Sequence, residues 1–400
     1  MNIDTRISAS QMTGSLDRLF DLAVQKVRLL DREWDASLGT PVFTANGTYT
    51  TRGWTEWTQG FQFGCAILAF DATGEKDLLE LGRKQTLGRM APHVTHIGVH
   101  DHGFNNLSTY GNLCRLIREG RFEPGQWERD FYEMAIKASG AVQAARWAEA
   151  QDGGGYVYSF NGPHSLFIDT MRTIRVLGVA HQLGHYLAGE NDRHISLLGR
   201  LVTHGLTTAR WNIYYGEGRD SYDQPDLRGR TVHEAIFNRN DGRFRCPSSQ
   251  QGYSPFTTWT RGLAWAILGF AEELEFLQSL APAEFTRAQI ADKASVLATF
   301  EQAARATADF YIDQATAADG IPYWDTGAPG LPKLEDWQSR PAEPFNDHEP
   351  VDSSAAAIAA QGLLRLGRYL GANGTRYFQA GLNVTKTLLA EPYLSTAPRH

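Results

Sequence analysis

The chain has 400 residues, of which 42% are hydrophobic and 21% are charged. This composition suits a globular protein with a sizeable buried core and excludes an intrinsically disordered chain. The formal net charge of −7 disfavours a nucleic acid as partner, because nucleic-acid binding rests on clustered Lys and Arg side chains that neutralise phosphates.

The first residues of the chain and its cysteines indicate in which cellular compartment the protein acts. The first residues, MNIDTRISAS, contain no basic segment followed by an apolar run, and no stretch approaches the roughly 18 uninterrupted apolar residues of a membrane helix. Cys65, Cys114 and Cys246 are isolated from one another, without the spacings typical of zinc sites, so we expect small buried side chains and no metal. We therefore expect a cytoplasmic protein with no membrane partner.

The dominant pattern along the chain is the helical period. Apolar residues recur at helical spacings in segments near 15–34, 57–72, 75–90, 104–118, 127–150, 164–187, 190–210, 257–276, 284–313, 352–370 and 374–390. Long loops rich in Gly, Pro and aromatic residues separate some of these segments, and loops of that kind are usually functional. Many helices of similar length predict an all-α fold in which helical hairpins form a ring, as one domain over residues 1–400.

Short strands are expected only inside the loops. Alternating residues at 231–237 and 243–246, around Asn240-Asp241-Gly242, predict a β-hairpin. The chain has neither a βαβ alternation nor a GxGxxG segment, so a nucleotide-binding α/β fold is disfavoured.

The densest group of polar side chains, His100-Asp101-His102, lies where a loop becomes a helix. Two interpretations of Asp101 stay open: its side chain caps the helix by accepting backbone N–H bonds, or it is a functional carboxylate. A metal site is disfavoured, because no third ligand follows at a fixed helical spacing.

A second carboxylate, Asp169, follows the apolar residues Leu166-Phe167-Ile168 in a segment predicted to be helical. Burial among apolar residues is costly for a carboxylate unless it is paired, neutral or functional. Desolvation raises the pKa of a carboxyl group, which a general acid working near neutral pH requires. The alternative is a structural Asp169 that caps a neighbouring helix or pairs with Arg172 or Arg175.

Aromatic residues flank an arginine in the segment Trp259-Thr260-Arg261-Gly262-Leu263-Ala264-Trp265, again where a loop becomes a helix. An Arg between aromatic rings can hold a carboxylate through forked hydrogen bonds while the rings flank a sugar. Core packing is the alternative for each Trp. The segment Trp57-Thr58-Gln59-Gly60 repeats the Trp-Thr-x-Gly pattern, which favours a shared role for the two segments.

At these residues the sequence resembles the unsaturated glucuronyl hydrolases of glycoside hydrolase family 88. The matching segments are Trp57-Thr58 with Gly60-Phe61, His100-Asp101 with Gly103-Phe104, Ile168-Asp169, His233, Gln251-Gly252, Trp259-Thr260-Arg261-Gly262 with Ala264-Trp265, Tyr323-Trp324-Asp325 and Asp352-Ser353-Ser354-Ala355. Their order, and the combination of WTRGxAW with YWD and DSSA, make the resemblance specific. It implies an (α/α)6 barrel of six helical hairpins as a single catalytic domain. Since about eleven helices are expected from periodicity, the last helix of the barrel would be missing from this chain.

The resemblance also implies a substrate and a reaction. The family acts on oligosaccharides that a polysaccharide lyase leaves with a 4,5-unsaturated uronic acid at the non-reducing end. The enzyme hydrates the C4=C5 enol ether without a cofactor or metal, and the sugar then opens and releases the remaining saccharide. By resemblance, Asp169 is the general acid/base and Asp101 the second essential carboxylate. The substrate-binding residues that the resemblance implies are Trp57, His100, His233, Gln251, Trp259, Arg261 and Trp265.

Two other functions stay open at this point. An unsaturated rhamnogalacturonyl hydrolase of the related family 105 would perform the same chemistry on pectin fragments, and only the preferred leaving sugar separates the two. A non-catalytic carbohydrate-binding barrel would keep the aromatic residues without needing Asp169. The presence of both Asp101 and Asp169 counts against that second alternative.

Overall fold

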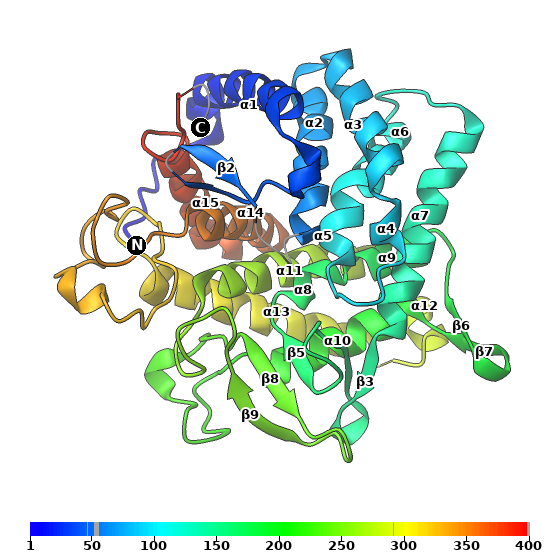
Figure 1. Ribbon diagram of the computed structural model, residues 1–400. Helices are drawn as coiled ribbons and strands as arrows, with labels where there is room; N and C mark the ends of the chain where they lie inside the picture. The colour runs from blue at the N-terminus through cyan, green and yellow to red at the C-terminus, as the bar shows by residue number, and fades with distance from the viewer. Residues whose placement is uncertain (46, 52–55, 291, 398–400) are drawn as a thin grey trace. The chain divides into compact units, whose positions relative to one another are not determined.

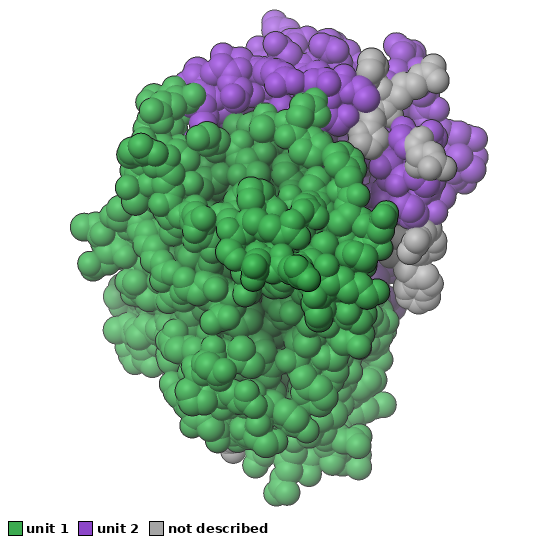
Figure 2. Space-filling view, turned by 90° about the vertical axis from the view of Figure 1, so that its left-hand side faces the viewer, with its two compact units in different colours: residues 1–11, 146–175, 198–393 green, residues 12–145, 176–197, 394–400 purple. Residues whose placement is uncertain are grey.

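The computed structural model describes residues 1–45, 47–51, 56–290 and 292–397, and it is mostly helical (Figure 1). Backbone contacts divide the chain into two compact units, which Figure 2 colours separately. The first unit contains residues 1–11, 146–175 and 198–393, and the second contains residues 12–145, 176–197 and 394–400.

The second unit is helical apart from two short hairpins. Its helices are α1 (Thr13–Glu33), α2 (Gln59–Thr73), α3 (Lys76–Arg89), α4 (Ala91–Val94), α5 (His102–Asn106), α6 (Asn112–Arg118), α7 (Gln126–Ala145) and all but the first residue of α9 (Arg175–Gln182). The antiparallel hairpins are β1 (Phe43–Ala45) with β2 (Thr48–Thr50) and β6 (Leu187–Gly189) with β7 (Arg193–Ile195). α2 packs against α1, α3 and α5.

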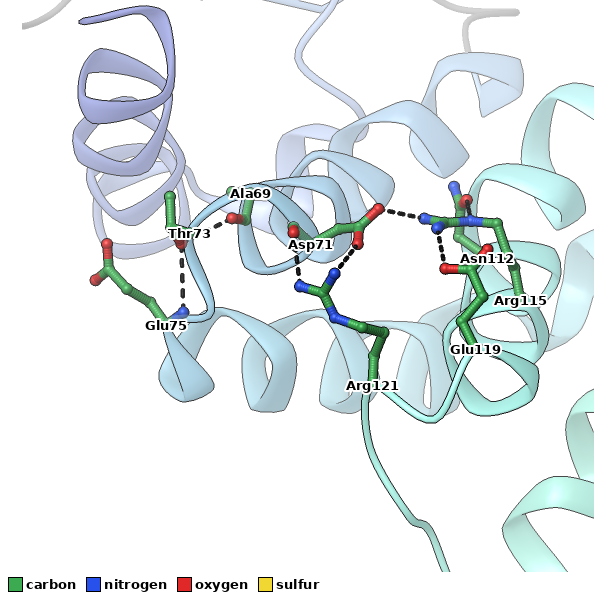
Figure 3. Close-up of polar contacts among 8 residues, drawn as sticks. All are labelled: Ala69, Asp71, Thr73, Glu75, Asn112, Arg115, Glu119 and Arg121. Carbon is green, nitrogen blue, oxygen red and sulfur yellow. Dashed lines mark hydrogen bonds and ion pairs between the residues drawn. The ribbon is translucent and has the colours of Figure 1, made fainter. Parts of the chain in front are cut away.

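Ion pairs join α2 to α6 and to the segment that follows α6 (Figure 3). Asp71 on α2 accepts a hydrogen bond from Arg115 Nη2 at 2.6 Å, and its Oδ1 lies 3.4 Å from Arg121 Nη1. Arg121 Nη2 also donates to the Asp71 carbonyl oxygen at 2.8 Å. Because such partly exposed pairs contribute roughly 0.2–1 kcal/mol each, they orient α2 and α6 more than they stabilise the unit.

The first unit is organised around α11 (Thr260–Ser279), which is buried along most of its length and contacts α8, α13 and α14. Its other helices are α8 (Thr170–Thr173), α10 (Leu197–Trp211, from Leu198 on), α12 (Pro282–Arg287), α13 (Lys293–Phe310), α14 (Ser353–Leu370) and α15 (Thr375–Leu388). Its strands form the hairpin β3 (Trp147–Glu149) with β4 (Gly155–Val157) and the three-stranded sheet of β5 (Ser165–Phe167), β8 (Glu234–Phe237) and β9 (Phe244–Ser248).

Two glycines, two helical turns apart on α11, let the chain segment around α8 lie directly against the helix. A Cβ atom on Gly262 would stand 3.0 Å from Ile168 Cγ2, and one on Gly269 would stand 2.8 Å from the Met171 carbonyl carbon. A backbone atom cannot give way as the end of a side chain can, so Gly269 has no room for a larger residue. The two glycines therefore set how closely the segment that carries Asp169 approaches α11.

The sequence predicted most helices correctly and missed the strands that interrupt others. Segment 127–150 is helical only to Ala145 and continues into β3, segment 164–187 begins with β5, and segment 190–210 includes β7 before α10. The segment predicted as one helix at 284–313 is broken into α12 and α13. A short apolar run has the same composition in a buried strand and in a helix, so its distant strand partner decides between them. The hairpin predicted at 231–237 and 243–246 is confirmed by β8 and β9.

Expectations about membrane spans, metal sites and cysteines can be compared with the described residues. Among them we find no helical stretch with the length and hydrophobicity that a bilayer span needs. Within the same residues, no group of three or more His, Cys, Asp or Glu side chains is arranged to hold a metal ion. Cys65 and Cys246 are exposed and Cys114 is partly exposed, so the prediction of buried cysteines is wrong for all three, which lie on α2, β9 and α6.

The close contact of Gly269 on α11 with the Met171 backbone on α8 predicts that one added methyl group at Gly269 destabilises the protein. We expect Gly269→Ala to destabilise the protein by roughly 1–3 kcal/mol, because the new Cβ atom meets the Met171 backbone. Gly88→Ala on α3 is the matched control, since a Cβ atom there meets nothing within 4 Å. Replacing Gly by Ala in an open helical position is neutral or stabilising by up to about 1 kcal/mol. Thermal unfolding measures both, and equal melting temperatures for the two variants would contradict this packing.

α11 also carries a fully buried carboxyl group, Glu273, whose two side-chain oxygens have no hydrogen-bond partner among the described residues. Burial raises the pKa of Glu273 from 4.5 to about 8, although the nearby charge of Arg175 opposes the shift. The folded protein therefore keeps a proton on Glu273 at pH values where the unfolded chain has lost it. The stability that this group contributes is present below pH 4.5 and is lost as the pH rises toward 8.

This linkage predicts that Glu273→Gln becomes more stabilising as the pH rises. At pH 4 the variant and the original protein should melt at similar temperatures, because both carry a neutral side chain. At pH 8 we expect the variant to melt roughly 2–8 °C higher. Glu133→Gln on α7, where Glu133 pairs with Lys137 at 3.8 Å, is the control and should show no such gain. A variant that is less stable at pH 8 would mean that Glu273 is ionised and paired in the folded state.

Candidate functional site

The three-stranded sheet of the first unit brings three of the predicted site residues together. β8 pairs antiparallel with both β5 and β9, with Phe167 opposite Glu234 and Glu234 opposite Ser248. The end of β5, the beginning of β8 and the end of β9 therefore lie at the same edge of the sheet. Beyond that edge the pairing continues, because Ile168 N donates to the His233 carbonyl oxygen at 2.9 Å. Asp169, His233 and Gln251 are the residues that follow or precede these strand ends.

His233 is buried at this edge in a defined protonation state. Its Nδ1 accepts hydrogen bonds from the backbone N–H groups of Gln250, at 3.0 Å, and Gln251, at 3.3 Å. An atom that accepts two N–H bonds carries no proton, so the imidazole is neutral and its own N–H is on Nε2. The ring centroid lies 4.2 Å from that of Phe167 and 5.0 Å from that of Trp259. His233 thus holds the loop after β9 and keeps a donor on its other nitrogen.

Asp169 lies between β5 and α8, and not within a helix as the sequence predicted, because the preceding residues pair with β8. Only 6% of its surface is exposed, and its side chain makes no capping hydrogen bond with α8. Arg172, one of the two proposed structural partners, pairs with Glu272 at 3.0 Å. The guanidinium of Arg175, the other, lies 4.8 Å from the Phe276 ring centroid. These contacts give both arginines other neighbours and do not support a cap by Asp169 on α8.

The Trp-Thr-x-Gly pattern at the start of α11 has a steric explanation. Trp259 is the N-cap residue of the helix in extended conformation, and a Cβ atom on Gly262 would stand 2.6 Å from its Cε3. The indole therefore folds back over Gly262, against the Ile168 side chain on which that glycine also packs. The guanidinium carbon of Arg261 lies 5.1 Å from the Trp259 ring centroid, a cation–π distance. Trp265, one turn after Arg261 on α11, is buried.

The YWD segment supports this helix start from a distant part of the chain. Thr260 Oγ1 donates to the Tyr323 carbonyl oxygen at 2.7 Å, and Asp325 forms an isolated antiparallel bridge with Trp259. Asp325 is fully buried, and burial raises the pKa of its carboxyl group, although backbone N–H bonds from Gly327 and Tyr253, both at 2.9 Å, oppose the shift. The sequence matched this segment to the family but assigned it no role. Its role in this unit is to hold Trp259 and the loop that contains Gln251.

Asp352, from the DSSA segment, is a second residue whose role the sequence left open. Its Oδ2 accepts a hydrogen bond from Arg261 Nη1 at 2.6 Å. Its Oδ1 accepts from the Ala355 backbone N–H at 2.8 Å and so caps α14. The sequence matched the DSSA segment to the family and placed Asp352 at a predicted helix start, but an Asp there is also the signal of an ordinary cap.

In the second unit, Asp101 occupies the N-cap position of α5 but makes no side-chain capping bond. Its backbone oxygen accepts from Phe104 N and Asn105 N. Its side chain is 10% exposed, and its Oδ1 lies 3.8 Å from His100 Nε2. The capping interpretation of its carboxylate is therefore not supported. Trp57 packs with its ring centroid 5.7 Å from that of Phe104, on the helix that Asp101 begins.

The Gly60 position explains the second Trp-Thr-x-Gly segment. A Cβ atom there would stand 2.4 Å from Asn105 Cα, and Gly60 N donates to Asn105 Oδ1 at 2.8 Å. His102 and Asn106 both contact Ser139 Oγ on α7 at 2.9 Å. The polar residues of α5 thus attach it to α2 and α7, and the buried carboxylate of Asp101 lies at the start of this fixed helix.

Comparison with known proteins identifies relatives by sequence and by fold. No protein-family model matches the sequence. The chain is 24% identical to an unsaturated glucuronyl hydrolase of Formosa agariphila, over 85% of this chain and 69% of the relative. It is also 24% identical to an unsaturated glucuronyl hydrolase of Bacillus sp. strain GL1, over 82% and 72%. The chain is a homologue of the unsaturated glucuronyl hydrolases. An unsaturated chondroitin disaccharide hydrolase of Streptococcus pyogenes is 25% identical, over 66% of this chain and 59% of the relative.

Solved structures of unsaturated glucuronyl hydrolases share the fold of the chain. One, specific for heparin, matches with a TM-score of 0.70 and 20% identity, over 94% of this chain and 85% of the other. The Streptococcus agalactiae enzyme matches with a TM-score of 0.67 and 18% identity, over 98% and 86%. A variant of that enzyme in complex with dGlcA-GalNAc6S matches with a TM-score of 0.60, 18% identity and coverage of 98% and 85%. The predicted all-α, α/α-barrel class is confirmed.

The hydrogen bonds of His233 predict how its replacements differ. His233→Ala should destabilise the protein by roughly 1–3 kcal/mol, because the buried N–H groups of Gln250 and Gln251 lose their acceptor. His233→Asn places an amide oxygen near the position of Nδ1, so it should recover most of that loss. Thermal unfolding gives the stabilities, and hydrogen exchange at Gln250 and Gln251 gives the local effect. Equal losses and equal exchange rates in both variants would show that Nδ1 does not hold this loop.

Proposed function

We propose that the chain is a glycoside hydrolase that removes a 4,5-unsaturated uronic acid from the non-reducing end of lyase-generated oligosaccharides. The observation that carries the proposal is a buried carboxylate, Asp169, that precedes α8 and lies at the same sheet edge as His233 and the loop of Gln251. Homology to unsaturated glucuronyl hydrolases supports the same conclusion. We further propose that residues 1–400 act as one catalytic domain.

In the proposed reaction Asp169 is both acid and base. It gives its proton to C4 of the unsaturated sugar, and the C4=C5 electrons form the new C–H bond. The positive charge that develops at C5 is shared with the ring oxygen, and water adds there while returning a proton to Asp169. The hemiketal then opens by breaking its bond between C5 and the ring oxygen. The hemiacetal left at C1 releases the remaining saccharide. No step requires a cofactor or a metal.

Other predicted residues bind and orient the substrate in this proposal. Arg261 holds the uronate carboxylate with donors that Asp352 does not use, and Trp259 and Trp265 flank the sugar ring. His233 and the side-chain amide of Gln251, whose Nε2 atoms lie 3.4 Å apart, bind a substrate oxygen in this proposal. The remaining binding residues are Trp57 and His100. Asp101 is the second essential carboxylate in this proposal.

Among leaving sugars, the relatives favour glycosaminoglycan fragments over pectin fragments. Two are named for glucuronyl substrates and one for chondroitin disaccharides. Unsaturated chondroitin, hyaluronan and heparin disaccharides are therefore the first substrates to assay, with gellan and pectin fragments as comparison. Loss of the ultraviolet absorbance of the conjugated C4=C5 uronate measures the reaction directly. Absence of any loss with the whole set would contradict the proposed function.

The acid/base assignment predicts a large effect of one isosteric substitution. Asp169→Asn should lower kcat by about 10²–10⁴, because an amide can neither give nor take the proton. Asp71→Asn is the matched control, since Asp71 is a carboxylate engaged by Arg115 and Arg121, and it should keep nearly full activity. The same ultraviolet assay compares the two. If Asp169→Asn retained the full rate, Asp169 would not be the acid/base.

A further inference from the structure

Two helices of the first unit begin at the same place, and one side chain joins them. α11 begins at Thr260, next to Arg261, and α14 begins at Ser353, next to Asp352. Arg261 Nη1 donates to Asp352 Oδ2 at 2.6 Å. The Asp352 side chain is 7% exposed and the Arg261 side chain 30%, so the carboxylate lies inside and the guanidinium reaches outward from it.

The two oxygens of Asp352 have separate tasks. Oδ1 accepts from Ala355 N at 2.8 Å and from Ser354 Oγ at 2.6 Å, which leaves Oδ2 for Arg261. Ser354 Oγ also lies 3.3 Å from Arg261 Nη1 and accepts a weaker hydrogen bond from it. A carboxylate is the side chain that can accept on both sides at once. An Asn would have to turn its amide N–H groups toward either the helix or the guanidinium.

The charges around Asp352 give this residue a second role besides capping α14. The first turn of α14 carries the partial positive charge of a helix N-terminus, and Arg261 adds a full one beside it. Asp352 offsets both. It engages Nη1 of Arg261 and leaves Nε and Nη2 on the rest of the planar group, which can bind a carboxylate side by side. Trp259 bounds the same guanidinium, with its centroid 5.1 Å from the guanidinium carbon.

We propose that Asp352 is a positioning residue that fixes the Arg261 guanidinium against Trp259 and thereby sets the preference of the enzyme for a free uronate carboxylate. The inference rests on the proposed function, in which Arg261 binds that carboxylate. Asp352 touches Arg261 and the α14 backbone, so it acts on the substrate through the orientation of Arg261. Without Asp352 the guanidinium keeps its charge but loses its fixed direction.

The test separates positioning from capping with Asp352→Ser. Serine is a good N-cap residue, so the start of α14 is retained, but its short side chain does not reach Arg261. Turnover is measured with an unsaturated disaccharide that carries a free carboxylate and with its uncharged methyl ester. We expect the ratio of kcat/KM for acid over ester to fall about tenfold, mainly through a higher KM for the acid. The kcat/KM for the ester should change little.

The matched control is Asp292→Ser at another helix start. Asp292 caps α13 by accepting from Ser295 N at 3.1 Å, so the substitution tests the loss of a carboxylate cap away from Arg261. It should leave the acid-over-ester ratio unchanged. The double variant of Asp352→Ser with Arg261→Gln should show no lower ratio than Arg261→Gln alone, because the effect of Asp352 passes through Arg261.

Three outcomes would overturn the inference. An unchanged ratio in Asp352→Ser, with equal losses for acid and ester, would make Asp352 a structural residue only. A raised ratio would show that Asp352 competes with the substrate for the guanidinium. A ratio that falls further in the double variant than in Arg261→Gln would show that Asp352 acts by another route. If the unmodified protein turns over neither substrate, the proposed function itself fails, and that result is distinct from the other three.

Discussion

The first unit depends on the close approach of one chain segment to α11. Gly262 and Gly269 remove the side chains that would hold Ile168 and Met171 away, so the segment that carries Asp169 lies on a buried, rigid helix. Everything placed at the start of that helix is then fixed relative to Asp169. The acid/base role proposed for Asp169 needs such a fixed position, because a small displacement of the carboxyl group from the reacting atom lowers the reaction rate strongly. The glycines are thus part of the site although neither carries a functional group.

Strand pairing and hydrogen bonds at the edge of the three-stranded sheet also fix the positions of site residues. Alternation of antiparallel strands brings the end of β5, the start of β8 and the end of β9 together, and the neutral imidazole of His233 fixes the loop that follows β9. Because Nδ1 is committed to backbone N–H groups, only Nε2 remains as donor. The fold therefore selects the tautomer, and no neighbouring carboxylate is needed to do so.

Sequence alone predicted the fold class, the β8–β9 hairpin and the motifs that gather in the first unit. Those predictions rest on periodicity and on family motifs, which are properties of adjacent residues. It failed at β5, because a strand of only three residues, Ser165–Phe167, is recognised only by its partner, about 70 positions away in the sequence. It also gave Asp325 and Asp352 no role, since the donors to these buried carboxylates include groups far away in the sequence, such as Tyr253 N and Arg261 Nη1. Burial of Trp259 over Gly262 could have been inferred from the Trp-Thr-x-Gly spacing, had its steric cause been recognised.

Three buried aspartates of the first unit show why residue type does not determine role. The side-chain oxygens of Asp325 accept hydrogen bonds from the N–H groups of Tyr253 and Gly327. Those of Asp352 accept hydrogen bonds from the start of α14 and from Arg261. Each side chain thereby supports other groups. Asp169 precedes α8 but gives that helix no capping bond. That difference agrees with the acid/base role that we propose for Asp169.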